Sequence, residues 1–195
     1  MKSIAIKLSL CVLALAILPV NCFGKRHELP PDPRFAAIDQ IVILPVIDAR
    51  AGKKDKVNLE SLGKTTAGVL KRKNYTAIRT DNTGTAGEIV EEDLNDARPE
   101  WIKRLGPPEA RWVMVIGLGE IHSSLTFGST GNAEVIGFLF DKQDGSVLWK
   151  GTGVGQAGQG GLAGMAMKGM MKGEALDNAM GNLLGSFPNL PKKKK

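Results

Sequence analysis

The chain has 195 residues and a formal net charge of +6, and its excess of positive charge lies at its two ends. Lysine and arginine number 26 against 20 acidic residues, but Lys2, Lys7 and the terminal run Lys192–Lys195 account for the whole difference. The rest of the chain is neutral and lacks the clustered cationic face that phosphate contacts need. This distribution argues against a nucleic-acid partner.

Residues 1–24 have the pattern of a secretory signal peptide. Lys2 and Lys7 precede an apolar run from Leu8 to Val20, which is shorter than the roughly 20 residues that span a bilayer. Two cleavage sites remain open: one before Cys22, with lipid attached to that cysteine, and one after Gly24. Cys11 and Cys22 are the two cysteines of the chain, so no disulfide framework is expected. We predict export to the periplasm, with a lipidated Cys22 as the candidate anchor to the outer membrane.

The remainder divides into three parts. Residues 25–35 are rich in proline and predict an extended spacer that tethers the folded domain. Residues 36–190 are long enough for one domain with one core. Residues 191–195 form a lysine-rich tail, which is most simply a solvated end.

The domain opens with the pattern of a β-α-β unit. The nearly continuous apolar run from Ile41 to Ile47 predicts a strand buried on both faces, with Pro45 near its end. Asn58 is placed to cap a helix that continues to about Lys73. A short strand is expected over 75–79. Because a helix joins the two strands, they are expected to be parallel.

The second half predicts antiparallel structure. Glu88–Ala97 and a segment beginning at Pro99 have helical patterns. Three strands follow within residues 111–154, and Asp144-Gly145 is a strong hairpin signal between the last two. A final helix is expected over 174–187. The predicted fold class is therefore α/β (α+β), with a single mixed sheet, a C-terminal antiparallel meander and flanking helices.

Residues 153–158 read Gly-Val-Gly-Gln-Ala-Gly and match the dinucleotide-binding pattern G-x-G-x-x-G. The pattern binds a cofactor when it opens a helix and a second parallel strand follows. Here Gln159-Gly160-Gly161 is a poor helix start, and no strand is expected after the last helix. We therefore predict no cofactor site at this motif.

Catalytic and metal-binding patterns are also missing from the sequence. The two histidines, His27 and His122, lie in the spacer and in a predicted strand. Neither accompanies a nucleophile motif or a group with metal-ligand spacing. The protein is not expected to be an enzyme.

The segment 157–173 is unusually rich in glycine and methionine. Small residues recur four apart, and methionine makes adaptable apolar surfaces. One interpretation is a surface that docks on a partner or a membrane, and the other is a loop leading into the last helix. The candidate contact residues share an apolar side chain: Leu162, Met165, Met167, Met170 and Met171.

The order of these motifs resembles a group of bacterial envelope lipoproteins of unknown function. The resemblance rests on Ile41-Val42-Ile43-Leu44-Pro45, on Ile136–Asp141 and on Gly145–Gly151, and it covers about residues 38–187. Their domain is similar to the N-terminal domain of TolB. Curli secretion-channel lipoproteins and lipoprotein activators of cell-wall synthases look like more distant relatives. The resemblance implies a non-enzymatic role in an envelope assembly.

Three functions are compatible with these observations, in order of preference. The first is an envelope accessory protein that binds other proteins or further copies of itself. The second is a periplasmic module that binds a small ligand. The third is a nucleotide-binding enzyme that uses the glycine motif at 153–158.

Overall fold

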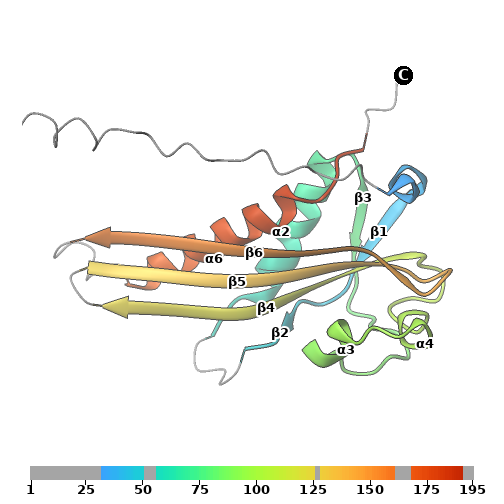
Figure 1. Ribbon diagram of the computed structural model, residues 1–195, viewed down its shortest axis with the longest axis horizontal. Coiled ribbons are helices and arrows are strands. Elements are labelled where there is room, and N and C mark those ends of the chain that lie inside the picture. Colours follow the sequence, from blue (N-terminus) through green and yellow to red (C-terminus); the bar gives the residue numbers. More distant parts are fainter. Residues whose placement is uncertain (1–31, 51–55, 126–127, 161–167, 191–195) are drawn as a thin grey trace, which may run out of the picture. The chain divides into compact units, whose positions relative to one another are not determined.

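A six-stranded mixed sheet organises the part of the chain that the structure describes (Figure 1). The structure is a computed structural model and describes residues 32–50, 56–125, 128–160 and 168–190. The strand order is β3-β1-β4-β5-β6, and β2 pairs with β4 off this path. All described residues belong to one compact unit, Pro31–Lys195. The predicted α+β class with a single mixed sheet is confirmed.

The β-α-β opening is also confirmed. β1 (Gln40–Ile43) pairs in parallel with β3 (Thr76–Arg79) and with β4. In the chain, α2 (Leu59–Arg72) comes between β1 and β3. Asn58 caps its first turn by accepting a hydrogen bond from the Ser61 N–H at 3.1 Å. The predicted strand 41–47 is divided into β1 and the two-residue β2 (Ile47–Asp48), because Pro45 has no N–H to give to the sheet.

Two short helices follow β3. The predicted helix 88–97 is reduced to α3 (Glu91–Asn95), which follows Gly87 at φ 82°, a left-handed position outside any helix. The helix predicted from Pro99 is present as α4 (Pro99–Ile102). Both lie on the same side of the sheet, where Trp101 meets Phe140 edge to face at 5.9 Å.

The antiparallel meander consists of β4 (Trp112–Leu125), β5 (Gly128–Asp141) and β6 (Ser146–Gly160). Its last strand is longer than the sequence indicated, because it continues through the glycine motif. The final helix, α6 (Lys168–Gly185), begins earlier and ends earlier than predicted. No helix among the described residues is long and apolar enough to cross a membrane.

The sheet is buried on both faces around β1, as the alternation of the residues there shows. Ile41 and Ile43 face the side covered by α2 and α6, whereas Val42 and Leu44 face α3 and α4 (Figure 1). Each face therefore has its own apolar core. The segment directly after α6 closes the larger core. There the Phe187 ring packs against Phe35, Tyr75 and Trp149.

The predicted spacer extends less far toward the domain than expected. Residues Pro33–Ala37 form a 3-10 helix, η2, in which Phe35 is buried. Arg34 also bonds to Asp144 at 3.0 Å and to Ser146 at 2.8 Å in the β5–β6 turn. Segment 32–35 is therefore part of the domain, because an apolar ring and a guanidinium hold it there.

Candidate functional site

A groove opens at the carboxyl ends of the parallel strands β1 and β3, beside the start of α2. It consists of two adjoining hollows of about 450 Å³ and 610 Å³, which share Pro45, Val46 and Leu59. The first is lined in addition by residues of β1, β3 and α2: Ile43, Leu44, Glu60, Gly63, Arg79, Thr80 and Asp81. The second is lined by residues on both sides of β2 and before α3: Ile47, Asp48, Ala49, Arg50, Thr83, Gly87, Glu88, Ile89, Val90 and Glu92.

The groove exists because two neighbouring strands end while the sheet continues. β3 pairs with β1 only as far as Arg79, and β1 ends at Ile43. β4 continues and pairs with β2 at Gly117 and Leu118 instead. The chain therefore crosses from β1 to β2 at Pro45 and leaves a crevice outside the strand ends. Crevices of this kind hold the ligands of open α/β sheets.

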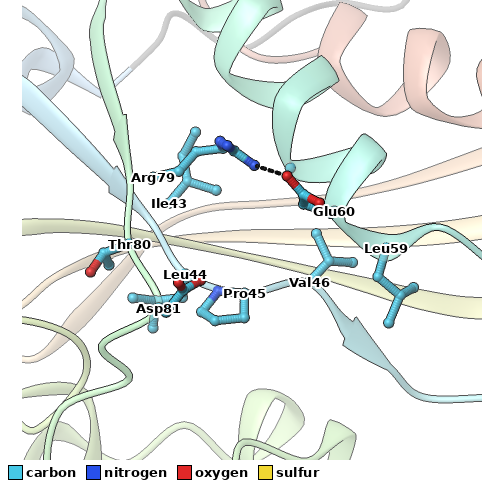
Figure 2. Close-up of a pocket in the computed structure, with 10 residues that line it drawn as sticks. Ile43, Leu44, Pro45, Val46, Leu59, Glu60, Arg79, Thr80 and Asp81 are labelled. Carbon is cyan, nitrogen blue, oxygen red and sulfur yellow. Dashed lines mark ion pairs between the residues drawn. The ribbon is translucent and has the colours of Figure 1, made fainter.

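The floor of the groove is apolar. Ile43 and Leu44 are almost fully buried there, at 1% and 2% exposure. Val46 and Leu59 are half-buried and pack against the larger core. Figure 2 shows Pro45 between these apolar side chains, with the charged ends of Arg79 and Glu60 at the margin. A ligand seated here would contact apolar side chains before it met a charge.

One margin carries an ion-pair network centred on Glu60. Its carboxylate lies 2.7 Å from Lys64 Nζ on the same helix and 3.7 Å from Arg79 Nη1 on β3 (Figure 2). The hydrogen bond from Lys64 is the main cause that lowers the pKa of Glu60 below its ordinary value. The network is well exposed, so it positions these side chains more than it stabilises the fold.

The other margin is anchored by a bidentate pair. Arg50 Nε and Nη2 each donate to an Asp48 carboxylate oxygen at 2.7 Å. Both side chains are shielded, with Arg50 at 8% and Asp48 at 15% exposure. Parallel hydrogen bonds of this geometry fix orientation as well as charge. The end of β2 is held in place as one wall of the groove.

Three further carboxylates face the groove, from Asp81, Glu88 and Glu92. All three residues are exposed, and no ion pair among the described residues involves them. Glu60 and Asp48, by contrast, have cationic partners. The described lining of the groove therefore carries carboxylates that no described cation pairs with, although the chain between its terminal lysines is neutral.

The groove chemistry suits binding. Its described lining contains carboxylates, two guanidinium groups and the hydroxyls of Thr80 and Thr83, but no histidine, cysteine or serine. A nucleophile with an adjacent base is the arrangement that covalent catalysis needs, and these residues do not form one. Within the described residues, no cluster of histidine, cysteine and acidic side chains could hold a metal ion.

No protein-family model matches the chain, and no curated protein matches it. The chain is similar in fold to a bacterial lipoprotein. That structure, GNA1162 from Neisseria meningitidis, has 18% identity and a TM-score of 0.47, covering 71% of this chain and 96% of its own. PelC from Paraburkholderia phytofirmans, a dodecamer, has 14% identity and a TM-score of 0.45 over 83% and 94% of the two chains. The hypothetical protein CT253 from Chlamydia trachomatis has 14% identity and a TM-score of 0.38 over 74% and 97%.

GNA1162 is itself described as a lipoprotein, which agrees with the predicted resemblance to bacterial lipoproteins. The more specific likeness to the N-terminal domain of TolB stays a prediction, as do the signal peptide and the periplasmic or outer-membrane location.

Of the residues predicted from the sequence, the described Met170 and Met171 do not line the groove. Cys22, Leu162, Met165 and Met167 lie outside the described residues. Met170 is 64% exposed at the first turn of α6, and its role as a contact residue stays a prediction. Met171 is 4% exposed and belongs to the larger core, so its side chain packs inward.

The glycine motif is a packing surface. Gly153 and Gly155 lie on β6 directly against the backbone of α6, so close that a Cβ on either would collide with it. The helix therefore covers the face where a dinucleotide would have to approach. α6 also follows β6 after a connection of several residues, so it is not opened by the motif.

No single sequence pattern predicted the groove. Pro45 within the apolar run 41–47 was one available signal, since it divides the run at the point where the crevice forms. The acidic residues after β3 were another. Neither indicates a site until the topology shows that β1, β2 and β3 end at the same place.

Proposed function

We propose that the protein is a non-enzymatic accessory protein of the bacterial cell envelope that binds another protein through the groove beside β2. The observation that carries this proposal is the groove itself, with an apolar floor and fixed charged margins. Protein interfaces commonly combine an apolar centre with a polar rim.

Val90 offers a direct probe of the site. It lines the groove and is 43% exposed. Val147 is a matched control, because it is 40% exposed on β6 and does not line the groove. A photoreactive amino acid at either position should leave the fold intact.

The test is crosslinking in living cells that export the full chain. We expect the probe at Val90 to label a defined protein and the probe at Val147 to leave it unlabelled. Val90→Arg should abolish co-purification of that protein, while Val147→Arg should preserve it. Equal labelling from both positions, or labelling from neither, would contradict the proposal.

A small ligand is the second candidate, and the volume of the groove favours it. Pockets for small molecules commonly enclose about 300–1,000 Å³, and each hollow lies in that range. Such pockets are usually rich in aromatic side chains, and none lines the described groove. A thermal shift with envelope metabolites that Val90→Arg removes would favour this function over protein binding.

The cellular location of the protein is proposed in the same way. We infer export, with lipid on Cys22 or cleavage after Gly24 as the two alternatives. The intact mass of the native protein isolated from membranes distinguishes them, because the lipid and the cleavage site both change that mass. A mass that still includes Met1 would contradict export.

The apolar segment before α6 is a second proposed contact. Because residues up to Gly160 belong to β6, the test must spare that strand and the buried Met171. Replacing residues 162–167 with glycine and serine, together with Met170→Ser, should weaken membrane or partner association. Unchanged association would remove this segment from the proposal.

A further inference from the structure

β3 is an edge strand of the sheet. It pairs in parallel with β1, and no other strand among the described residues pairs with it. The Thr80 N–H donates to the Ile43 carbonyl of β1 at 3.1 Å. Because the backbone groups of successive residues point to opposite sides of a strand, those of Ala77 and Arg79 point away from β1. No described residue bonds to them, so they form an open row of donors and acceptors.

The middle of this edge carries an exposed apolar side chain. Ile78 is 47% exposed, although its register neighbour on β1, Val42, is buried at 5%. Ile78 also lies between Ala77 and Arg79, the two residues whose backbone groups face outward. A strand that paired with this edge would therefore cover Ile78 as well.

The carboxyl end of the edge is acidic. Asp81 comes two residues after β3 and is exposed. Glu60, at the start of α2, lies beside the same end, 3.7 Å from Arg79 Nη1 (Figure 2). No described cation forms an ion pair with Asp81, so its carboxylate is available to a cation from another molecule.

The amino end of the edge is basic. The Tyr75 N–H bonds to the Leu70 carbonyl at 3.0 Å, so the last turn of α2 lies beside the start of β3. That turn carries Lys71 and Arg72, which are both exposed and form no ion pair with a described residue. The edge therefore has a negative and a positive end. A second copy of the same edge, running in the opposite direction, would bring opposite charges together at both ends.

We propose that β3 pairs with β3 of a second copy of the chain, antiparallel about a two-fold axis that passes beside Ile78. Each Ala77 would exchange backbone hydrogen bonds with Arg79 of the other copy, and the two Ile78 side chains would meet at the axis. Asp81 of each copy would lie beside the basic end of the other. Such an interface is isologous, so every contact occurs twice. This inference goes beyond the proposed function, which crosslinking from the groove tests separately.

A disulfide tests the geometry. In an antiparallel pair, opposed residues that are not hydrogen-bonded have Cα atoms about 4.5 Å apart, within the range of about 4.4–6.8 Å that disulfides span. We expect Ile78→Cys to give a covalent dimer of the full exported chain under mild oxidation. Val154→Cys is the matched control, because Val154 is 53% exposed on β6, the opposite edge, and should give none. The unmodified chain controls for crosslinks through Cys22.

Sedimentation equilibrium over a concentration series tests the association without a crosslink. An interface of this size is at the weak end of the range, so we expect a reversible dimer. Ile78→Lys should weaken dimerisation at least about tenfold, because two like charges would meet at the axis. Val154→Lys is the control and should leave dimerisation unchanged.

Charge reversal separates pairing from misfolding. Asp81→Lys should weaken dimerisation about tenfold, as should Lys71→Glu combined with Arg72→Glu, because each change brings like charges together at both ends of the interface. A mixture of the two variant proteins should dimerise more tightly than either protein alone, since opposite charges meet again in the mixed dimer. A misfolded variant would not recover in this way.

A chain that stays monomeric at all concentrations and forms no disulfide through Ile78→Cys would overturn the inference. Dimerisation that Val154→Lys removes and Ile78→Lys preserves would assign the contact to β6 and overturn it too. A mixture that dimerises no better than its components would overturn the pairing of the charged ends.

Discussion

Gly155 on β6 lies directly beneath the carbonyl oxygen of Ala175 on α6, closer than any side chain would permit. A Cβ at Gly155 would fall far inside 3.0 Å of that oxygen, a separation that real Cβ atoms essentially never show. Gly153 has the same relationship to Ala179 one helical turn later. The two glycines of the G-x-G motif therefore allow the helix to lie flat on the strand.

Gly155→Ala is expected to destabilise the domain. The added methyl group meets backbone atoms of α6, at Ala175 and Ala179, and cannot be accommodated by a side-chain rotation, so α6 must move away from β6. Overpacking of this kind costs about 1–3 kcal/mol in ordinary cores, and we expect a loss at the upper end of that range. Urea denaturation of the purified protein measures it, and an unchanged midpoint would contradict the packing role.

Gly181→Ala is the matched control on the helix itself. Gly181 is exposed within α6, and a Cβ there meets nothing within 4 Å. Alanine favours the helical conformation over glycine by about 1 kcal/mol. We therefore expect the free energy of unfolding to rise by about that amount in the same urea assay. A lower free energy of unfolding for Gly181→Ala would show that α6 is constrained at a position where the structure leaves space.

Local sequence patterns predicted the elements well where one residue determines the outcome. Asn58 specified the start of α2, and Asp144-Gly145 specified the last hairpin, where Gly145 adopts φ 71°. The extent of β6 could not be predicted in this way. Glycine disfavours a strand in isolation, and the strand persists through Gly155 because α6 packs there. That contact depends on residues about 20 positions away.

Two asparagines on α6 cover part of the edge of β6. Asn182 Nδ2 donates to the Val154 carbonyl at 2.7 Å, and Asn178 Nδ2 donates to the Gln156 carbonyl at 2.9 Å. β6 is the last strand of the sheet, so these carbonyls would otherwise be open to another chain. The amides therefore protect an edge strand that also exposes Val154.

We expect Asn178→Ala with Asn182→Ala to lower the free energy of unfolding by about 1 kcal/mol or more relative to Asp177→Ala. The control lies on the same helix, is exposed and gains similar helix propensity. Sedimentation velocity should also show more self-association in the double variant, because the edge is exposed. Equal stability and equal sedimentation of the two proteins would rule out this role.

Tyr75, the one tyrosine of the chain, has a buried hydroxyl that finds no hydrogen-bond partner among the described residues. Burial raises its pKa from 10.0 to about 12. Because the pKa is higher in the folded state, its contribution to stability is full below pH 10 and is lost as the pH rises toward 12. The near-ultraviolet absorbance of tyrosinate should therefore appear about two pH units later in the folded protein than in urea.

Tyr75→Phe completes this test. The substitution removes a buried polar atom that gains nothing from its surroundings, so the free energy of unfolding at neutral pH should stay equal or rise. The alkaline loss of stability should become smaller, because the raised pKa of the Tyr75 hydroxyl no longer contributes to it. A marked destabilisation at neutral pH would mean that the hydroxyl has a partner.

The groove could not be predicted from sequence for a related reason. Pro45, Arg79 and Glu88 are far apart in the chain and meet because β1, β2 and β3 end near one another. No local pattern records such a coincidence of strand ends. The glycine motif is the opposite case. Its sequence matched the pattern of a dinucleotide-binding site, but in the fold its glycines form the surface on which α6 packs. The motif pattern therefore suggested cofactor binding at a place where the glycines are explained by helix packing.

Arg34 connects η2 to the β5–β6 turn and should make this contact sensitive to acid. Its guanidinium donates to Asp32 at 2.9 Å and to Asp144 at 3.0 Å. Hydrogen bonding from Arg34 lowers the pKa of Asp32 below its ordinary 3.8. A hydrogen bond from Ser146, followed by the charge of Arg34, lowers the pKa of Asp144.

Because both pKa values are lower in the folded state, the stability from these contacts is present above the ordinary value and is lost as the pH falls through the folded one. Arg34→Gln should therefore be less stable than the unmodified protein at neutral pH, and the difference should shrink below pH 3.8. Urea denaturation at a series of pH values measures this difference. Arg98→Gln is the control, since Arg98 and its nearest acid, Asp96, are 3.9 Å apart and almost fully exposed. If the stability difference between Arg34→Gln and the unmodified protein stayed constant with pH, the contact would stabilise the fold through packing of the arginine side chain and not through its charge.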